Sequence, residues 1–346
     1  MDLVVLVASF AVILIGSELF TNGIEWFGHK LELGEGAIGS VLAAIGTALP
    51  ETMVPLIAIL FGGGIAASEV GVGAILGAPF MLSTLTMFVT GSAVLLLRRR
   101  RTNGTSVAVS PGVLGHDMAY FAVTYSIAVG TAFLPIEYEW PRRLVALLLI
   151  GMYAYYVWGH LRADAEVHET LEPLRFHKLD RSAPQHPAPP RLVIVSIQVL
   201  FALACIVGGA WGFVHSVTSL AGSLGVNGTL LSLLIAPIAT ELPEKLNSVL
   251  WISKGKDTLA LGNVTGAMVF QSAIPTSVGL LLAPALWSVG GEGLAFASAG
   301  IALASSAAIF IPMFLRQRLG AWALLRGGAF YLVYLVFILA TLARVI

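Results

Sequence analysis

Long apolar stretches dominate the chain and alternate with short polar connections. A transmembrane helix needs about 20 mostly apolar residues to cross the hydrocarbon layer of a bilayer. By that measure the pattern predicts ten spans, at residues 3–27, 36–61, 70–97, 115–135, 144–161, 192–214, 228–252, 258–282, 294–315 and 321–345. Five spans precede a longer polar stretch and five follow it, so we expect an all-α integral membrane protein with two halves.

The polar stretch at residues 162–191 separates a first five-helix half, 1–161, from a second, 192–346. It is rich in proline and scattered charge and has too few apolar residues to bury a core, so we expect a hydrated connector. Three widely spaced histidines in it are interpreted as solvated residues rather than a metal or pH-sensing cluster: His168, His177 and His186.

Basic residues indicate how the chain is oriented in the membrane. Most of them, among them Arg98 to Arg101, fall in or beside the odd-numbered connections. By the positive-inside rule the connector is cytoplasmic and both termini are extracytoplasmic. We expect the first apolar run to be a retained span, because no basic leader or small-residue cleavage site precedes it. Since each half has an odd number of spans, the second half is an inverted copy of the first.

The composition supports a membrane protein and narrows its partners. Of 346 residues, 57% are hydrophobic and 11% charged, with a mean hydropathy of +0.89, far from the balance of a soluble domain. Nineteen basic residues offset nineteen acidic ones, so the charge favours neither nucleic acid nor a polyanion as a partner. The single cysteine, Cys205, lies in an apolar run and excludes a disulfide framework.

Two of the apolar segments are interrupted in the same way. Leu49-Pro50-Glu51 follows Thr47 in the second span, and Leu242-Pro243-Glu244 follows Thr240 in the seventh. Both pairs, the glutamates and the threonines, are 193 positions apart (244 minus 51). Proline disturbs a helix, and a carboxylate at bilayer depth is costly unless it is paired or hydrated. Matched breaks of this kind in inverted halves predict an ion site near the midplane.

These motifs resemble the α-repeats of the calcium/cation antiporter superfamily, in particular its sodium/calcium exchanger branch. The repeats of that branch read G-T-S-L-P-E and then G-N-V-x-G-S-N. Here GTALPE stands at residues 46–51, TELPE at 240–244 and GNVTGA at 262–267. The resemblance implies a sodium/calcium exchanger-like fold of ten helices in an inverted 5+5 repeat, with α-repeats near 36–90 and 228–282.

The resemblance also implies a secondary active antiporter that exchanges Ca2+ or another divalent cation for Na+ or H+. Calcium takes about six to eight oxygen ligands, including carboxylates, so Glu51 and Glu244 are the expected metal-binding carboxylates. When the divalent ion leaves, sodium ions or protons must neutralise them. By resemblance, Thr47 and Thr240 add hydroxyl or backbone oxygens, and Asn263 lines the site. An interhelical hydrogen bond is the alternative role for Asn263.

The chain departs from the family pattern beside both motifs. The family serine is Ala48 in the first copy and Glu241 in the second, and Lys245 follows Glu244 directly. The Asn or Asp of the second motif falls on Pro79 and Met268. Two interpretations are open. Either Glu241 replaces a lost ligand, or Lys245 pairs with Glu241 or Glu244 and acts as a built-in cation.

The same departures support a second hypothesis, a degenerate family member that senses or scaffolds without transporting. An enzyme is not expected, because the chain has no nucleophile with an adjacent base, no zinc-binding spacing and no phosphate loop. We expect no cofactor besides the transported ions, and inorganic cations and the lipid bilayer as partners. The short connector, which has no regulatory domain, predicts a prokaryotic plasma membrane protein.

Overall fold

The computed structural model describes residues 2–30, 45, 48–62, 64–109, 111–162, 171–179, 190–224, 241–253, 255, 257–290 and 293–345. The described helices are α1 (Asp2–Lys30), α4 (Leu49–Phe61), α5 (Ile65–Met81), α6 (Met87–Leu96), α7 (Pro111–Gly130), α8 (Glu139–Arg162), α9 (Leu192–Leu224), α11 (Leu242–Ser253), α12 (Asp257–Leu282), α13 (Gly293–Arg316) and α14 (Ala321–Val345). Shorter elements are the π-helix η2 (Leu82–Thr86), the 3-10 helices η3 (Thr131–Phe133), η4 (Arg175–Leu179) and η5 (Pro284–Leu286), and the antiparallel strands β1 (Ser106–Val107) and β2 (Leu319–Gly320).

Six described helical runs are long and apolar enough to cross a membrane: Leu3–Ile24, Ala67–Leu96, Leu192–Leu220, Ala260–Leu282, Gly293–Arg316 and Ala321–Ile338. They coincide with the first, third, sixth, eighth, ninth and tenth predicted spans. The fourth and fifth predicted spans form α7 and α8, and the second and seventh are described in part, as α4 and α11. The helical membrane architecture is confirmed, while the count of ten spans stays a prediction.

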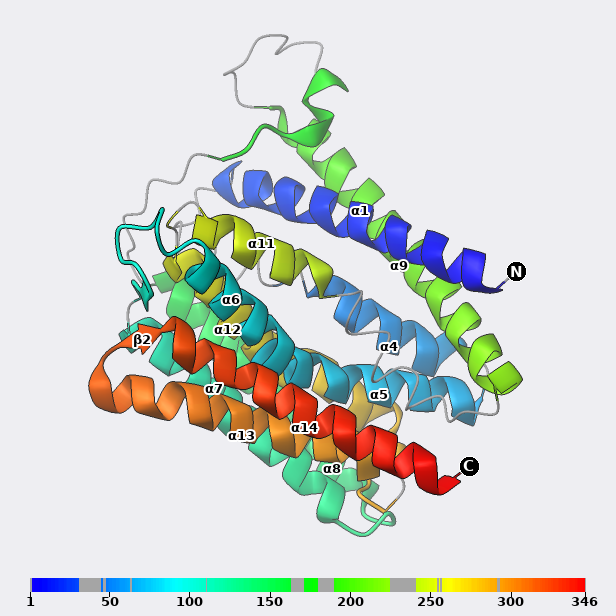
Figure 1. Ribbon diagram of the computed structural model, residues 1–346. Coiled ribbons are helices and arrows are strands. Elements are labelled where there is room, and N and C mark those ends of the chain that lie inside the picture. The colour runs from blue at the N-terminus through cyan, green and yellow to red at the C-terminus, as the bar shows by residue number, and fades with distance from the viewer. Residues whose placement is uncertain are drawn as a thin grey trace.

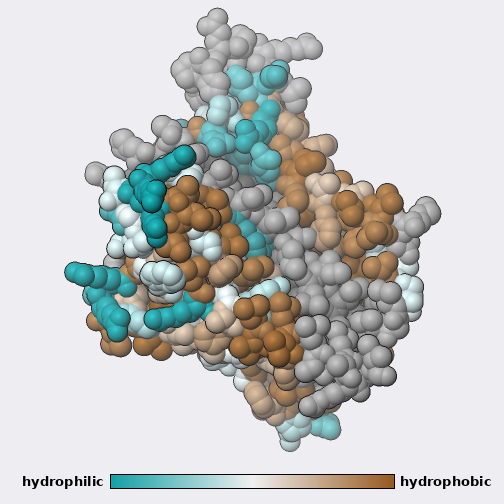
Figure 2. All heavy atoms as spheres, in the orientation of Figure 1, coloured by the Kyte–Doolittle hydropathy of each residue, from teal (hydrophilic) through white to brown (hydrophobic). Residues whose placement is uncertain are grey.

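The run α5–η2–α6 and helix α12 form the centre of the bundle (Figure 1). In the most apolar stretch of each of these two spans, 83% of the residues are buried, against 29% in α1 and 28% in α14. The outer helices expose apolar side chains, and Figure 2 shows them along the flank formed by α1 and α9; they include Val4, Val7, Leu200, Phe201 and Trp211. Such a surface is suited to lipid rather than water.

A π-helical turn interrupts the central α5–α6 run at Leu82–Thr86. Pro79 shortly before it has no backbone N–H, and its ring disturbs the preceding helical turn. The hydroxyls of Ser83 and Thr84 donate to the carbonyl oxygen of Phe80 at 3.0 and 2.6 Å. π-turns of this kind frequently mark functional sites, and this one places three buried hydroxyl side chains in mid-span.

Helices α1 and α9 lie side by side (Figure 1) and pack antiparallel through glycines. A Cβ added to Gly16 would lie 3.0 Å from Cγ1 of Ile206, and one added to Gly209 would lie 2.7 Å from Cγ1 of Ile13. The two glycines are 193 positions apart (209 minus 16), and so are the two isoleucines (206 minus 13). The contacts are therefore reciprocal, as a local two-fold axis between α1 and α9 requires.

The same reciprocity recurs around the central helices. Oγ1 of Thr124 in α7 lies 2.7 Å from Oγ of Ser272 in α12. Oγ of Ser305 in α13 donates to the carbonyl oxygen of Ser83 in η2 at 2.7 Å. Ser83 and Ser272 are 189 positions apart (272 minus 83) and Thr124 and Ser305 are 181 apart (305 minus 124). Both contacts therefore join one half to the other, and exchanging the two halves turns one contact into the other.

A buried ion pair fastens the turn after α6 to the start of α12. Nη1 and Nη2 of Arg101 donate to Oδ1 and Oδ2 of Asp257 at 2.7 and 2.6 Å. The two side chains are 4% and 1% exposed, and the backbone N–H of Ala108 also donates to Asp257 at 2.8 Å. Arg101 therefore differs from its exposed neighbours Arg98 to Arg100, because its paired charge can be buried.

We expect Arg101→Ala to lower the free energy of unfolding by about 3 to 5 kcal/mol, because it leaves the Asp257 carboxylate buried without its cation. The matched control is Arg143→Ala, whose exposed pair with Glu139 contributes about 0 to 1 kcal/mol. Denaturant unfolding of the detergent-solubilised protein, followed by circular dichroism, measures both. Equal losses of stability in the two variants would contradict a structural role for the buried pair.

Candidate functional site

The two Leu-Pro-Glu motifs each open a helix. Helix α4 begins at Leu49 and α11 at Leu242, so the proline is the second residue and the glutamate the third in both. Proline is tolerated there because the first backbone N–H groups of a helix have no intrahelical partner. The positive end of the helix dipole also favours a carboxylate in the first turn. The local chemistry therefore presents Glu51 and Glu244 in equivalent settings.

Both carboxylates are buried, Glu51 with 3% and Glu244 with 0% of its surface exposed. Glu51 lies within electrostatic range of Glu244, Glu241 and Lys245, so the two repeats meet here. Neither carboxylate oxygen of Glu51 has a hydrogen-bond partner among the described residues. A buried carboxylate without hydrogen bonds is costly unless a cation or proton accompanies it. The arrangement is therefore suited to binding a cation.

Lys245 is paired with Glu241. Its Nζ donates to Oε2 of Glu241 at 2.9 Å, and the two side chains are 8% and 0% exposed. The hydroxyl of Thr86, from the π-helix η2, donates to the same oxygen at 3.5 Å. Of the two interpretations left open by the sequence, the geometry favours the built-in cation, with Glu241 rather than Glu244 as its partner.

Helix α12 brings two buried amides into the centre of the bundle. Asn263 is 2% exposed and Gln271 is fully buried. Neither the Oε1 nor the Nε2 of Gln271 has a hydrogen-bond partner in the described part of the chain. The positions of the family Asn or Asp are also buried, and Pro79 and Met268 offer no side-chain oxygen there.

The threonines of the two motifs, Thr47 and Thr240, lie outside the described residues, so their predicted roles are not tested. Sequence reasoning missed Thr86, which reaches Glu241 from another helix. The available signal was the run of hydroxyl residues Ser83, Thr84, Thr86 and Thr90 within an otherwise apolar span. Intramembrane polar residues face protein or water rather than lipid.

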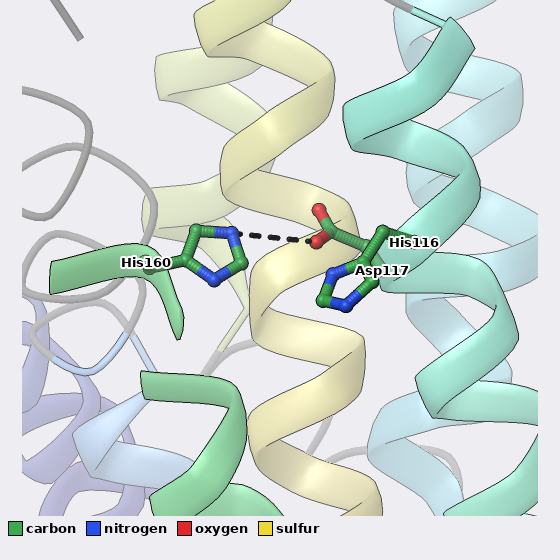
Figure 3. A group of neighbouring side chains, drawn as sticks. All are labelled: His116, Asp117 and His160. Carbon is green, nitrogen blue, oxygen red and sulfur yellow. Dashed lines mark ion pairs between the residues drawn. The ribbon is translucent and has the colours of Figure 1, made fainter. Parts of the chain in front are cut away.

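A second group of polar side chains lies between α7 and α8 (Figure 3). His116, Asp117 and His160 have ligand atoms that all lie within 4.8 Å of one another. Asp117 is fully buried, and His116 is exposed. Sequence reasoning did not find this group because His160 is 43 positions from Asp117 (160 minus 117). Only the packing of the two helices brings them together.

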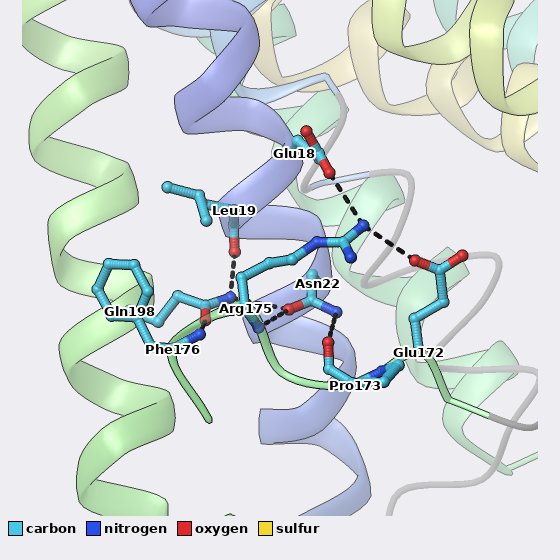
Figure 4. Close-up of polar contacts among 8 residues, drawn as sticks. All are labelled: Glu18, Leu19, Asn22, Glu172, Pro173, Arg175, Phe176 and Gln198. Atoms are coloured by element: carbon cyan, nitrogen blue, oxygen red, sulfur yellow. Dashed lines mark hydrogen bonds and ion pairs between the residues drawn. The ribbon is translucent and has the colours of Figure 1, made fainter. Parts of the chain in front are cut away.

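The described part of the connector packs onto α1 and α9 (Figure 4). The backbone N–H of Arg175 donates to Oδ1 of Asn22 at 3.0 Å, and its Nη2 donates to Glu18 at 2.9 Å. Leu174 is 3% exposed, because it packs with Val195 and other apolar side chains of both helices. Residues 171–179 thus differ from the hydrated connector expected here.

Of the three connector histidines, His177 lies in this docked segment, within η4. His168 and His186 lie outside the described residues. Among the described residues, His177 does not belong to a group of three or more potential metal ligands. The docked segment instead attaches the connector to α1 through Asn22 and Glu18.

Comparison with known sequences finds relatives over most of the chain. The family model described as sodium/calcium exchanger protein matches residues 1–161 and 194–343. A relative from Alkalimonas amylolytica with the provisional name antiporter CaxA is 27% identical over 288 residues, which cover 82% of this chain and 81% of the relative. An uncharacterized membrane protein of Methanocaldococcus jannaschii is 21% identical over 268 residues, 77% of each chain.

Two solved structures share the fold. The H+/Ca2+ exchanger CAX superposes with a TM-score of 0.75 at 16% identity, covering 98% of this chain and 82% of that one. The sodium-calcium exchanger NCX_Mj superposes with a TM-score of 0.61 at 18% identity, covering 97% and 99%. At such identities the likeness shows the fold alone. The family match covers most of both halves, and the chain therefore belongs to the sodium/calcium exchanger protein family, whose members are exchangers rather than enzymes.

Proposed function

We propose that this protein is a secondary active antiporter that exchanges Ca2+, or another divalent cation, for H+ or Na+ at Glu51 and Glu244. The observation that carries the proposal is the pair of buried carboxylates in the first turns of α4 and α11, within electrostatic range of each other. Two carboxylates match the charge of one divalent cation. When that cation leaves, protons or sodium ions must replace it, because a doubly charged pair is costly in a low-dielectric interior.

Lys245 adjusts the charge of this site. Three carboxylates approach one another here, and the salt bridge from Lys245 cancels the charge of Glu241. Glu51 and Glu244 are left to balance the transported ion. Lys245 was one of the departures that favoured a non-transporting protein. Because its Nζ is bound to Glu241 at 2.9 Å, transport is the better-supported function.

Further ligands are assigned by position. Asn263 on α12 is buried and stands in the family's second motif, and Thr47 and Thr240 stand in the first. We propose that these three complete the oxygen set around the two glutamates. Thr86 supports the site indirectly, because its hydroxyl bonds to Glu241.

Alternating access follows from an inverted 5+5 repeat of ten spans, which the reciprocal contacts at Gly16 and Gly209 and at Ser83 and Ser272 support. Two halves related by a two-fold axis in the membrane plane can exchange conformations and so open to either side. In this proposal α1 and α9 slide together against the helices that hold the ligands. Both termini lie outside a prokaryotic plasma membrane, and the connector lies in the cytoplasm.

We expect Glu51→Gln to weaken divalent-cation binding about 10- to 100-fold, the range for loss of one charge-assisted contact, and to abolish flux at low cation concentration. Calcium uptake into proteoliposomes measures this. Glu139→Gln is the control, because Glu139 is exposed and paired with Arg143 at the start of α8. Intact calcium flux in Glu51→Gln would refute the central assignment.

We expect protons to be the coupling ion. Sodium, like calcium, is a hard cation that needs oxygen ligands, and the buried positions of Pro79 and Met268 supply none. A carboxylate needs no further ligand to take up a proton. Calcium added to sodium-free proteoliposomes that enclose a pH dye should therefore enter while protons leave. Uptake that requires a sodium gradient would show sodium coupling instead.

Lys245→Met tests the built-in cation. It leaves Glu241 as a third buried charge, so without divalent cation we expect a loss of about 3 to 5 kcal/mol of stability. Added calcium should then stabilise the variant more than it stabilises the unmodified protein. Lys245→Met combined with Glu241→Gln restores the charge balance and should reverse both effects. If the double variant behaves like the single one, Lys245 does not act through Glu241.

A further inference from the structure

The group formed by His116, Asp117 and His160 has the composition of a transition-metal site. Imidazole nitrogen and carboxylate oxygen are ligands for Zn2+ and its first-row neighbours, whereas Ca2+ prefers oxygen alone. Nε2 of His160 lies 3.8 Å from Oδ1 of Asp117, and in Figure 3 the imidazole of His116 lies beside this pair. The three ligand atoms all lie within 4.8 Å of one another, close enough to share one metal ion.

Hydrogen bonds outside the group orient two of the three ligands. Nδ1 of His160 lies 3.1 Å from the carbonyl oxygen of Tyr156, and because a carbonyl only accepts, Nδ1 carries the hydrogen. In the neutral ring Nε2 then presents its lone pair to Asp117. The carboxylate itself accepts from the Tyr156 hydroxyl at 2.9 Å and from the Thr265 hydroxyl at 2.7 Å. Such outer contacts fix the tautomer and direction of metal ligands.

When the His160 ring is neutral and Asp117 is ionised, the lone pair of Nε2 faces the carboxylate oxygen at 3.8 Å. Two electron-rich atoms repel at that separation unless a metal ion, or a proton on Nε2, lies between them. The repulsion is strong because Asp117 is fully buried and water does not screen its charge. The geometry thus calls for a positive charge at the point where the three ligands converge.

The other half of the chain offers an internal comparison. Thr124 and Ser305 correspond at an offset of 181, which places Ala297 and Ser298 at the positions of His116 and Asp117. Oγ of Ser298 makes its contact with the carbonyl oxygen of Leu76 at 3.4 Å. The fold therefore accepts a small neutral side chain at this helix contact, and a buried carboxylate is not required for packing.

The third ligand is also specific to the first half. Tyr153 and Tyr156 in α8 correspond to Tyr331 and Tyr334 in α14, 178 positions later (334 minus 156). At that offset the counterpart of His160 is Ile338, which is 1% exposed. The tyrosines are kept in both halves, whereas all three potential ligands occur in one.

We propose that His116, Asp117 and His160 bind a first-row transition-metal ion, best matched by Zn2+, at a site separate from Glu51 and Glu244. The exposed side of His116 leaves a fourth position for water, as in zinc sites with three protein ligands. The ion joins α7 to α8 and, through the bond from Thr265 to Asp117, braces both against α12. The site holds a resident ion and is not part of the transport path.

Zinc binding to the full-length, detergent-solubilised protein tests the proposal after treatment with a chelator. We expect Zn2+ to raise the unfolding temperature, and Co2+ to give the visible absorption of a four-coordinate site that Zn2+ removes. His160→Ala and His116→Ala should each weaken Zn2+ binding about 10-fold or more, since even outer-contact losses cost that much. His116 is exposed, and its ring lies against the rings of Tyr120 and Tyr156.

His215→Ala is the matched control, because His215 is exposed on α9 and also lies against an aromatic ring, that of Trp211. It should bind Zn2+ like the unmodified protein. Glu51→Gln should do the same, which separates this site from the proposed transport site. No response to Zn2+, or a full response in both His116→Ala and His160→Ala, would overturn the proposal and identify the group as a hydrogen-bonded ion pair.

Discussion

The cost of keeping carboxylates ionisable inside a helix bundle shapes the centre of this protein. Glu51 and Glu244 are buried and close enough to repel each other, so they are stable only with positive charge nearby. The protein supplies part of it through the start of each helix, where the dipole is positive, and part through Lys245, which neutralises Glu241. In the transport function that we propose, Glu51 and Glu244 balance the charge of one divalent cation or of two monovalent ones.

A local two-fold axis relates the helix contacts of the two halves. Glycines in α1 and α9 allow the two helices to approach until each packs on an isoleucine of the other, and the central helices repeat the pattern through serine hydroxyls. Because the contacts are reciprocal, each of these packing arrangements occurs twice in the described residues. The symmetry is broken at the site, where the second repeat carries Glu241, Lys245 and Asn263.

Helix α12 connects the polar features of the molecule. Its first turn is held by Arg101 through Asp257, its second turn carries Asn263, and Thr265 in the third turn donates to Asp117. Its span is 83% buried. The polar side chains of Asp257 and Thr265 therefore lie in the interior, where each has a partner on another element. These contacts fix the first three turns of α12 to the elements around it.

The sequence by itself determined the helical membrane architecture, because long apolar runs can satisfy their backbone only as helices in a bilayer. It also determined the Leu-Pro-Glu helix starts and singled out Glu51 and Glu244, since proline and charge are exceptional in such runs. The spacing of Glu241 and Lys245 already allowed their pairing, because residues three and four apart share a helix face, whereas adjacent ones do not. Only the tertiary structure brought Thr86 to Glu241, Arg101 to Asp257 and His160 to Asp117. Those partners lie far apart in the sequence, and their meeting depends on how the helices pack rather than on any local pattern.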